Sequence, residues 1–389
     1  MALKLHNTLS GTLEEFSPIE PGKAKVFVCG PTVYDLSHIG HAKTYTQFDI
    51  LVRTLRYLNY DVKYLVNITD VDDKLIKRAA EKGVDPSELA LEFEEAYFLD
   101  MKALGNTSVD KYARAHDYID QIVDQVKRLI EKGFAYKISD GYYFDIKKFE
   151  DYGKLSGRNT LKAGDSVSRV DENPEKRNPG DFCLWKFKKE GEPSWSAEIG
   201  EGRPGWHIED TAITETELGE QYDIHGGAID LIFPHHEAEI TQMESVSGKK
   251  PFVKYWLHTG FLNIDSEKMS KSLGNFLTIR EVLEKVSPMA LRYYFLSAQY
   301  RTPMNFSWEG LEAAQNALEK LKKFSDSLIR ENGRIDEAYK AKFMEKMEND
   351  LNTPQALAIL WTLVKDKEVT PENKRATLLD FDKVLGLGL

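Results

Sequence analysis

The sequence predicts an α/β protein in which a parallel sheet is interrupted by an insertion and followed by a bundle of α-helices. Three observations favour this fold class. Residues 25–68 follow a strand–helix–strand pattern, residues 151–205 are rich in glycine, proline and charge, and the patterns after residue 287 are helical. A strand–helix–strand unit predicts parallel strands joined by a right-handed crossover.

The first unit places polar groups at the ends of two strands. Lys25–Gly30 is a short apolar run, Gln47–Leu58 carries apolar residues at helical spacing, and Asp61–Ile68 is a second apolar run. In open parallel sheets, ligands bind outside the carboxyl ends of the strands. We therefore expect the chemistry of this protein at residues 29–41 and 67–73.

The remaining elements are expected from capping residues, turn residues and apolar spacing. In chain order they are a helix from Asp85, a helix over Asp117–Lys132, a hairpin at Asp140-Gly141, strands over Gly205–Ile213 and Gln221–Phe233, a helix from Pro234, and further helices from Ser287, over Leu311–Arg330, over Ala338–Asp350 and from Thr353. We expect five parts: the first half of the parallel-sheet domain (1–115), an inserted connective domain (116–204), the second half of the sheet domain (205–260), a linker with a lysine-containing loop (261–306) and an antiparallel helical bundle (307–389).

The composition excludes several classes of protein. The chain has 389 residues, a net charge of −11 and two cysteines, Cys29 and Cys183. So few cysteines disfavour a disulfide framework and suit a reducing compartment. No apolar run reaches 18 residues, which disfavours a membrane span, and the negative charge disfavours indiscriminate nucleic-acid binding through a basic face. We expect a cytoplasmic monomer that does not bind membranes.

Two short strings indicate activation of an acid by ATP. The first is His38-Ile39-Gly40-His41, and the second is Lys268-Met269-Ser270-Lys271-Ser272. Imidazoles at a helix N-terminus can donate hydrogen bonds to phosphate oxygens, Gly40 lets a purine lie flat on the backbone, and lysines on a loop can bind leaving pyrophosphate. Each string alone also fits an ordinary loop or a solvated turn, but the two together favour this chemistry.

A third group of residues could hold a metal ion. His235 and Glu239 are four residues apart on one expected helix face, which is suitable spacing for two ligands. Cys29 ends the first strand, and Asp210 ends the string Gly205–Asp210. These four side chains converge if the two halves of the sheet are neighbours. A capping or salt-bridge role for the His235–Glu239 pair, and a core role for Cys29, are the alternatives.

A fourth string, Asp223–Asp230, could bind a ribose. Gly226 and Gly227 would let the backbone approach the sugar, and Asp230 could accept hydrogen bonds from its hydroxyls. A tight turn is the alternative.

The chain resembles the cysteinyl-tRNA synthetases, which are class I aminoacyl-tRNA synthetases. The resemblance runs from about residue 20 to the end of the chain. It rests on Phe27–Asp35, His38–His41, Asn67–Lys74, Gly205–Glu209, Asp223–Gly227, Phe233–Glu239 and Lys268–Asn275.

The resemblance implies a Rossmann-like catalytic domain and a defined reaction. Such enzymes make cysteinyl-adenylate from L-cysteine and ATP with Mg²⁺, and then transfer cysteine to the terminal adenosine of tRNA(Cys). It implies ATP-binding roles for His38, His41 and Lys271, with Lys268 assisting, and a place near the adenosine for Asp230. It also implies a cysteine pocket at Thr69 and Trp206 with His236 beside it, and zinc ligands at Cys29, His235 and Glu239.

Three departures from the family pattern affect these expectations. Asp210 stands where the family has a second cysteine ligand, so we expect a zinc site of one sulfur, one nitrogen and two oxygens. Ala228 and Ile229 stand where the family has a glycine and a serine before Asp230. The chain ends at Leu389, where family members usually continue with a small domain that contacts the anticodon.

Two other functions fit these departures. A ligase that joins cysteine to a small amine such as an amino sugar would share the catalytic core and also lack the anticodon domain. Residues 292–307 and 351–360, however, are similar to the tRNA enzyme. A non-catalytic binding module is suggested only by Asp210, and the intact histidine and lysine strings disfavour it.

Overall fold

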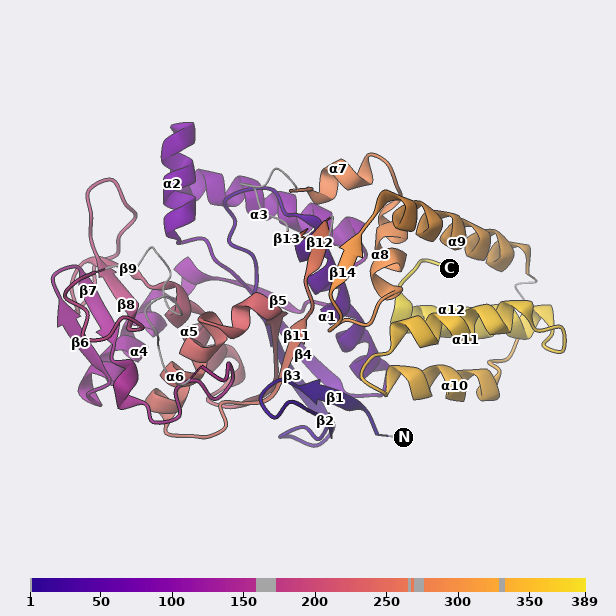
Figure 1. The fold of residues 1–389 in the computed structure, drawn as a ribbon, viewed down its shortest axis with the longest axis horizontal. Coiled ribbons are helices and arrows are strands. Elements are labelled where there is room, and N and C mark those ends of the chain that lie inside the picture. Colours follow the sequence, from indigo (N-terminus) through magenta and orange to yellow (C-terminus); the bar gives the residue numbers. More distant parts are fainter. Residues whose placement is uncertain (1, 159–172, 265–266, 269–275, 329–332) are drawn as a thin grey trace.

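The protein is built on a five-stranded parallel sheet with strand order β11-β10-β3-β4-β5 (Figure 1). The computed structural model describes residues 2–158, 173–264, 267–268, 276–328 and 333–389. The strands of this sheet are β3 (Lys23–Val28), β4 (Asp61–Ile68), β5 (Lys111–Arg114), β10 (Tyr222–Ala228) and β11 (Val253–Thr259). The chain order reverses between β3 and β10, and in such sheets ligands bind outside the carboxyl ends of the strands at this point.

Alternate residues of the strands pack against two different groups of helices. Val26 and Val28 of β3 belong to a core shared with α1, whereas Phe27 and Cys29 belong to a core shared with α4, α5 and α6. Successive side chains of a strand point to opposite faces of its sheet, so this alternation places Cys29 on the side of α5 and α6. The helices of this domain are α1 (Ile39–Tyr57), α2 (Asp73–Lys82), α3 (Pro86–Ala103), α4 (Ile119–Glu131), α5 (Trp206–Leu218) and α6 (His235–Ser247).

A second sheet, antiparallel, interrupts the parallel one in the sequence and lies at one end of the molecule (Figure 1). The hairpin predicted at Asp140-Gly141 is present, with its turn one residue earlier than expected, and the strand at 182–187 returns to pair with it. The strands of this sheet are β6 (Ala135–Ile138), β7 (Gly141–Phe144), β8 (Phe182–Phe187) and β9 (Gly202–Pro204).

The strand predicted over Gly205–Ile213 is wrong, because these residues begin helix α5. Nine of its 13 residues are buried, including Glu209, Asp210 and Thr211. A helix buried on all sides lacks the amphipathic period of 3.6 residues, so its short apolar stretches are easily mistaken for a strand. The strand predicted over Gln221–Phe233 is shorter than expected: β10 ends at Ala228, and a 3-10 turn spans Ile229–Ile232.

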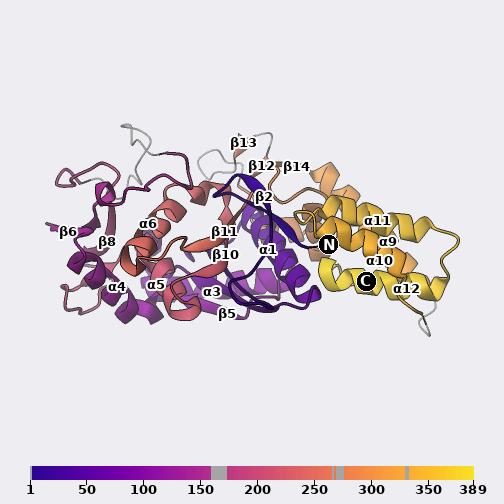
Figure 2. The ribbon, with the colours of Figure 1, turned by 90° about the horizontal axis from the view of Figure 1, so that it is seen from below.

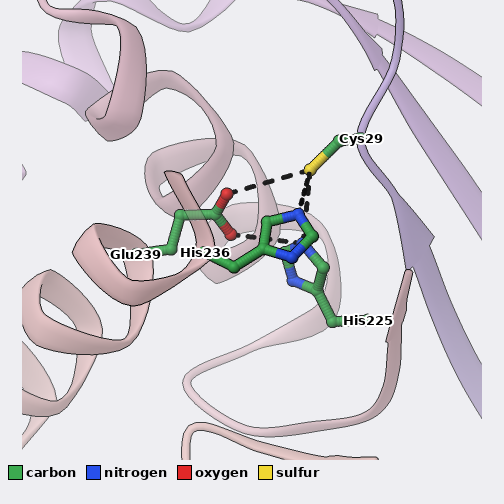
Figure 3. Close-up of side chains that lie close together, drawn as sticks. All are labelled: Cys29, His225, His236 and Glu239. Carbon is green, nitrogen blue, oxygen red and sulfur yellow. Dashed lines mark hydrogen bonds and ion pairs between the residues drawn. The ribbon is translucent and has the colours of Figure 1, made fainter. Parts of the chain in front are cut away.

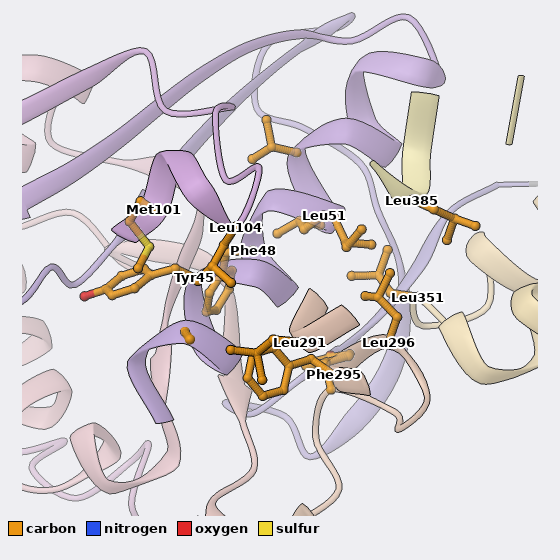
Figure 4. Close-up of a cluster of buried hydrophobic side chains, with 14 of the residues drawn as sticks. Tyr45, Phe48, Leu51, Met101, Leu104, Leu291, Phe295, Leu296, Leu351 and Leu385 are labelled. Carbon is orange, nitrogen blue, oxygen red and sulfur yellow. The ribbon is translucent and has the colours of Figure 1, made fainter. Parts of the chain in front are cut away.

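The C-terminal helices pack against α1 and lie at the end of the molecule opposite the second sheet (Figures 1 and 2). Their apolar side chains continue the core of the parallel sheet, as Phe48, Leu291, Phe295, Leu351 and Leu385 show (Figure 4). The helices of this region are α8 (Pro288–Leu296), α9 (Trp308–Ser327), α10 (Glu337–Met347), α11 (Thr353–Lys365) and α12 (Pro371–Leu385).

The helix predicted from Thr353 is confirmed as α11, but Thr353 is not its cap. Asn352 caps α11, since its side chain accepts a hydrogen bond from the backbone N–H of Gln355. A further helix, α12, was not predicted; Thr370 and Pro371 start it. Proline at the first helical position favours such a new start.

Short elements complete the fold. A three-stranded sheet has the order β13-β12-β14, and β1 pairs with β2. Their bounds are β1 (Lys4–Asn7), β2 (Thr12–Glu15), β12 (Leu262–Ile264), β13 (Glu267–Lys268), β14 (Met304–Phe306) and α7 (Ile279–Leu283). Within the described ranges, none of the helices has the length and apolar character needed to cross a membrane.

Candidate active site and metal centre

Four predicted metal donors lie together at the switch point of the sheet. Donor atoms of Cys29, Asp210, His235 and Glu239 are all within 4.8 Å of one another, and all four residues are buried. His235 Nε2 lies 3.1 Å from Asp210 Oδ2 and 3.0 Å from Glu239 Oε1, and Cys29 Sγ lies 3.8 Å from the same Glu239 oxygen. Helices α5 and α6 deliver three of these residues, and the end of β3 delivers Cys29.

Two further histidines surround the sulfur of Cys29. Its Sγ lies 3.3 Å from His225 Nε2 and 3.1 Å from His236 Nε2, and Glu239 lies beside both rings (Figure 3). Cys29, His225, His236 and Glu239 thus form a second group of converging donors, which overlaps the first. Burial lowers the pKa of His225 and of His236 well below the usual range, so both rings are neutral.

The sequence did not indicate His225 or His258 as part of this centre. His236 Nδ1 lies 2.8 Å from His258 Nε2, and His225 Nδ1 lies 2.6 Å from the Tyr222 hydroxyl, so each ring is held from behind. His225 occurs in the string interpreted as a ribose site. Its pairing with Phe27 across β10 and β3, which puts it on the side of Cys29, is known only from the register of the sheet.

The charge balance of the cluster suits a cation. Among the described residues, no lysine or arginine pairs with Asp210 or Glu239, and Glu239 Oε2 accepts no hydrogen bond. Burial, together with Glu239 and Asp210, raises the pKa of the Cys29 thiol well above its usual value. Burial alone would lower the pKa of His235, but the charges of Glu239 and Asp210 outweigh it and raise the pKa to about 9. One thiol, one imidazole and two carboxylates are donors that Zn²⁺ accepts.

The metal donors adjoin a cavity that the predicted ATP-binding histidines also line. The cavity has a volume of about 290 Å³. Its walls include, among the predicted site residues, Cys29, His38, Gly40, His41, Trp206 and Asp230. Trp206 stacks on His235 with ring centroids 4.1 Å apart, so the indole contacts one of the metal donors and also forms part of the cavity wall.

His38 and His41 are set by the start of α1. His38 is the N-cap of this helix, and its Nδ1 accepts hydrogen bonds from the backbone N–H groups of Gly40 (3.1 Å) and His41 (3.3 Å). Because Nδ1 accepts, the proton of the neutral ring is on Nε2. The two imidazoles stack with centroids 3.8 Å apart, and burial with the charge of Lys74 lowers the pKa of His41 to about 4.

The cavity is not lined by four of the residues predicted to bind cysteine or ATP, namely Thr69, His236, Gly226 and Gly227. Thr69 is buried and its hydroxyl accepts a hydrogen bond from Asn67 Nδ2 at 3.2 Å. A Cβ on Gly226 would lie 2.2 Å from Phe48 Cε1, so packing against α1 requires this glycine.

A second cavity of about 480 Å³ lies on the other side of the histidine pair. It shares His38, His41 and Lys74 with the first cavity, and Tyr34 and Phe276 are among its aromatic walls. Lys74 lies in the first turn of α2. It ends the segment Asn67–Lys74, which resembles the family, but the resemblance implied no role for this lysine.

The lysine string falls mostly outside the described residues. The backbone of Lys268 lies in β13, where it pairs with Asn263 of β12. Lys271 lies outside the described residues. The string is followed in the chain by Phe276, whose ring contacts His38 edge to face.

Solved structures show the same fold. The chain superposes on Mycobacterium tuberculosis methionyl-tRNA synthetase in complex with methionyl-adenylate with a TM-score of 0.62 and 17% identity, covering 94% of this chain and 90% of that one. It superposes on Agrobacterium radiobacter LeuRS, in a ternary complex with tRNA and LeuAMS, with a TM-score of 0.66 and 12% identity, covering 96% and 84%. The predicted parallel-sheet fold class is therefore confirmed.

Sequence comparisons identify the family. Residues 15–316 match the model of the class I (C) tRNA synthetase catalytic domain, and residues 342–389 match the DALR domain. The cysteine–tRNA ligase of Thermoplasma volcanium is 48% identical over 98% of this chain and 87% of the relative. That of Dehalococcoides mccartyi is 47% identical over 100% and 86%, and that of Thermococcus onnurineus 46% identical over 92% and 78%. The chain therefore belongs to the cysteine–tRNA ligase family of the class I tRNA synthetases.

Proposed function

We propose that this chain activates L-cysteine with ATP and transfers the cysteinyl group from cysteinyl-adenylate to the 3′-terminal adenosine of tRNA(Cys). The observation that carries the proposal is the convergence of Cys29, Asp210, His235 and Glu239 beside a cavity lined by His38 and His41. Because Cys29 belongs to the group of metal donors and also lines the cavity, a metal site and a nucleotide site would be neighbours in this arrangement.

The four converging residues would hold zinc. A bound Zn²⁺ prefers the thiolate of cysteine to the hydroxyl of serine, with a Zn–S bond of about 2.3 Å. Shape alone would separate these nearly isosteric side chains poorly. Trp206, stacked on His235 and facing the cavity, would pack against the bound amino acid, with Thr69 and His236 completing the pocket from behind.

The histidine pair would stabilise adenylation. Attack of the cysteine carboxylate on the α-phosphate builds negative charge on the phosphoryl oxygens and on the leaving pyrophosphate. His38 presents a protonated Nε2 because its Nδ1 is engaged by the helix backbone, so it can donate to those oxygens without reorganising. Asp230 would bind the ribose, and Lys268, Lys271 and Mg²⁺ would neutralise the triphosphate.

The proposal also includes the acceptor of the cysteinyl group, the compartment and the oligomeric state. We propose that tRNA(Cys) is the acceptor, that the protein acts in the cytoplasm, and that it functions as a monomer. Two observations support the tRNA substrate: residues 15–316 match the class I (C) tRNA synthetase catalytic domain, and relatives named cysteine–tRNA ligase match nearly the whole chain.

Amino-acid-dependent exchange of pyrophosphate into ATP tests this function. We expect exchange with cysteine, much weaker exchange with each of the other standard amino acids, and one zinc per chain in the same preparation. Radiolabelled cysteine should then become attached to tRNA(Cys) and not to amino sugars. Exchange that is independent of cysteine would contradict the proposed activity, and exchange with cysteine in protein free of zinc would contradict the proposed basis of selectivity.

A further inference from the structure

We infer that Asn67 is the positioning residue that allows the carboxylate of Asp210 to act as a metal ligand in place of a thiolate. This inference rests on the proposed metal centre and extends it to a residue outside the set of ligands. Asn67 is 1% exposed and is the penultimate residue of strand β4, whereas Asp210 lies in helix α5.

The two oxygens of Asp210 have different partners. Asn67 Nδ2 donates a hydrogen bond to Asp210 Oδ1 at 2.6 Å, and Asp210 Oδ2 faces His235 Nε2 at 3.1 Å. The Asn67 amide therefore donates its hydrogen bond to the Asp210 oxygen that points away from the other metal donors. It leaves the other oxygen directed toward them.

Asn67 is itself held rigidly at the ends of β3 and β4. Its Oδ1 accepts a hydrogen bond from the backbone N–H of Gly30 at 2.5 Å. A Cβ on Gly30 would lie 1.6 Å from the backbone oxygen of Asn67, so the two strand ends approach as closely as glycine permits. Because Gly30 follows Cys29, one side-chain amide connects the neighbour of one proposed ligand to the carboxylate of another.

A thiolate and a carboxylate make different demands on their surroundings. A cysteine sulfur is a single donor atom, whereas a carboxylate has two oxygens, and the one not bound to metal is costly to bury without a hydrogen bond. Hydrogen bonds to a ligating carboxylate orient it, and their loss typically lowers metal affinity by about 10- to 100-fold. The amide of Asn67 supplies such a bond to Asp210, and a cysteine at position 210 would not need it.

A double-mutant cycle on metal affinity tests this coupling. The full-length protein, Asn67→Ala, Asp210→Cys and the double variant are titrated with Zn²⁺ against a chelator, with thermal unfolding as the measure of folding. We expect Asn67→Ala to weaken zinc binding by about 10- to 100-fold when residue 210 is aspartate. We expect it to change zinc binding by no more than about twofold, the scatter of independent sites, when residue 210 is cysteine.

Controls separate positioning from general destabilisation. Asn178 is also a buried asparagine whose amide donates to carboxylates, those of Asp145 and Asp181, away from the metal centre. Asn178→Ala should lower the unfolding temperature without changing zinc affinity. Asn67→Asp, which keeps an acceptor for Gly30 but loses the donor to Asp210, serves in the same cycle if Asn67→Ala does not fold.

The outcomes distinguish this inference from the proposed function. An equal loss of zinc affinity in the aspartate and cysteine backgrounds would overturn the role of Asn67 while leaving the metal centre in place. Absence of zinc from all four proteins would overturn the metal centre and this inference together, while cysteine-dependent pyrophosphate exchange would still report on the activity.

Discussion

At the scale of single residues, the site combines groups held in unusual protonation states. His41 lies at the boundary of the two cavities, and its Nδ1 is buried without a hydrogen-bond partner among the described residues. Desolvation and the charge of Lys74 lower its pKa to about 4. The ring of His41 is therefore neutral at physiological pH, so in the proposed reaction it would act as a hydrogen-bond donor and not as a cation.

Replacing His41 by asparagine should slow adenylation at every pH by a similar factor. We expect kcat for pyrophosphate exchange to fall by about 10²- to 10³-fold, as for loss of one donor to transition-state charge. Because His41 loses its proton near pH 4, the ratio of wild-type to variant rates should be constant between pH 6 and pH 9, to within about twofold. A ratio that changes around pH 6.5 would show that His41 titrates with an ordinary pKa. Unchanged zinc content is the control for folding.

Lys43 is a buried lysine that binds the backbone of a residue in the wall of the first cavity. Its side chain is 1% exposed, and Nζ donates to the backbone oxygens of Gly260 (2.6 Å) and Tyr300 (3.2 Å). Burial lowers its pKa to about 8. Gly260 lines the cavity, so this lysine connects α1 to the cavity wall.

The stability of the protein should therefore rise with pH above pH 8 through Lys43. Between pH 8 and 10.5 the unfolded lysine keeps its proton while the folded one loses it, so the unfolded state binds more protons and rising pH favours folding. The contribution is about 1.4 kcal/mol per pH unit at most, or about 3 kcal/mol over the interval. Denaturant unfolding of wild type and Lys43→Met at pH 8, 9 and 10 should show the difference between their free energies of unfolding change by about 2 kcal/mol over these two pH units. If the free energies of unfolding of the two proteins change with pH in the same way, the lowered pKa of Lys43 is contradicted.

At the scale of elements, the contact between β10 and α1 sets how closely this helix packs on the sheet. Gly226 pairs with Val28 of β3 and with Leu257 of β11, and the ring of Phe48 from α1 fills the space where its Cβ would be. Phe48 is 2% exposed and cannot move outward. Since His38 caps α1 and His41 lies in its first turn, a shift of this helix would displace both imidazoles.

Gly226→Ala should destabilise the protein and disturb the histidine pair. Overpacking of a filled core typically costs about 1–3 kcal/mol, which urea unfolding would measure. In the Gly226→Ala background, Phe48→Leu should recover part of the loss because it removes the ring atoms that clash. If the double variant is no more stable than the sum of the single effects predicts, the clash is not with Phe48.

At the scale of the whole molecule, one buried arginine joins the sheet domain to the C-terminal helices. Arg292 of α8 is fully buried, and its guanidinium donates to Asp49 Oδ2 at 2.6 Å, to the oxygen of Leu385 at 2.7 Å and to Asn106 Oδ1 at 2.9 Å. These partners belong to α1, to the end of α12 and to the segment after α3. The C-terminal region is thereby connected to α1, the helix whose first turn holds the proposed ATP-binding histidines.

Removing this arginine should loosen the whole assembly. Arg292→Met leaves the buried Asp49 with Arg53 as its one ion-pair partner among the described residues, and breaking a buried pair on one side costs about 3–5 kcal/mol. Asp49→Asn in the same chain should restore part of the stability, because it removes the uncompensated charge. We expect limited proteolysis to reach α12 sooner in the single variant than in the double variant. Equal stability of the wild type and Arg292→Met would contradict this role.

Local patterns predicted much of the fold. Strand β4 has the predicted bounds, and α3 begins after its predicted cap, Asp85. The predicted hairpin is present, but its turn is Ser139-Asp140, one residue earlier than expected, and Gly141 is the first residue of β7. Helix α5 was missed because it is buried on nearly every side, so its sequence lacks the period that reveals a surface helix. Helix α12 was not predicted, although Thr370-Pro371 has the form of an N-cap followed by proline at the first helical position.

The sequence by itself determined the family, the parallel-sheet fold class and the identity of the residues that could bind zinc and phosphate. Those conclusions depend on residue types at fixed spacing, which a linear sequence displays. Only the tertiary structure decided that Cys29, from β3, meets Asp210, His235 and Glu239 from two distant helices, that Gly226 is small because of Phe48, and that Asn67 holds the second oxygen of Asp210. The physical reason is that strand register and helix packing, which act between residues far apart in the chain, set which side chains face one another.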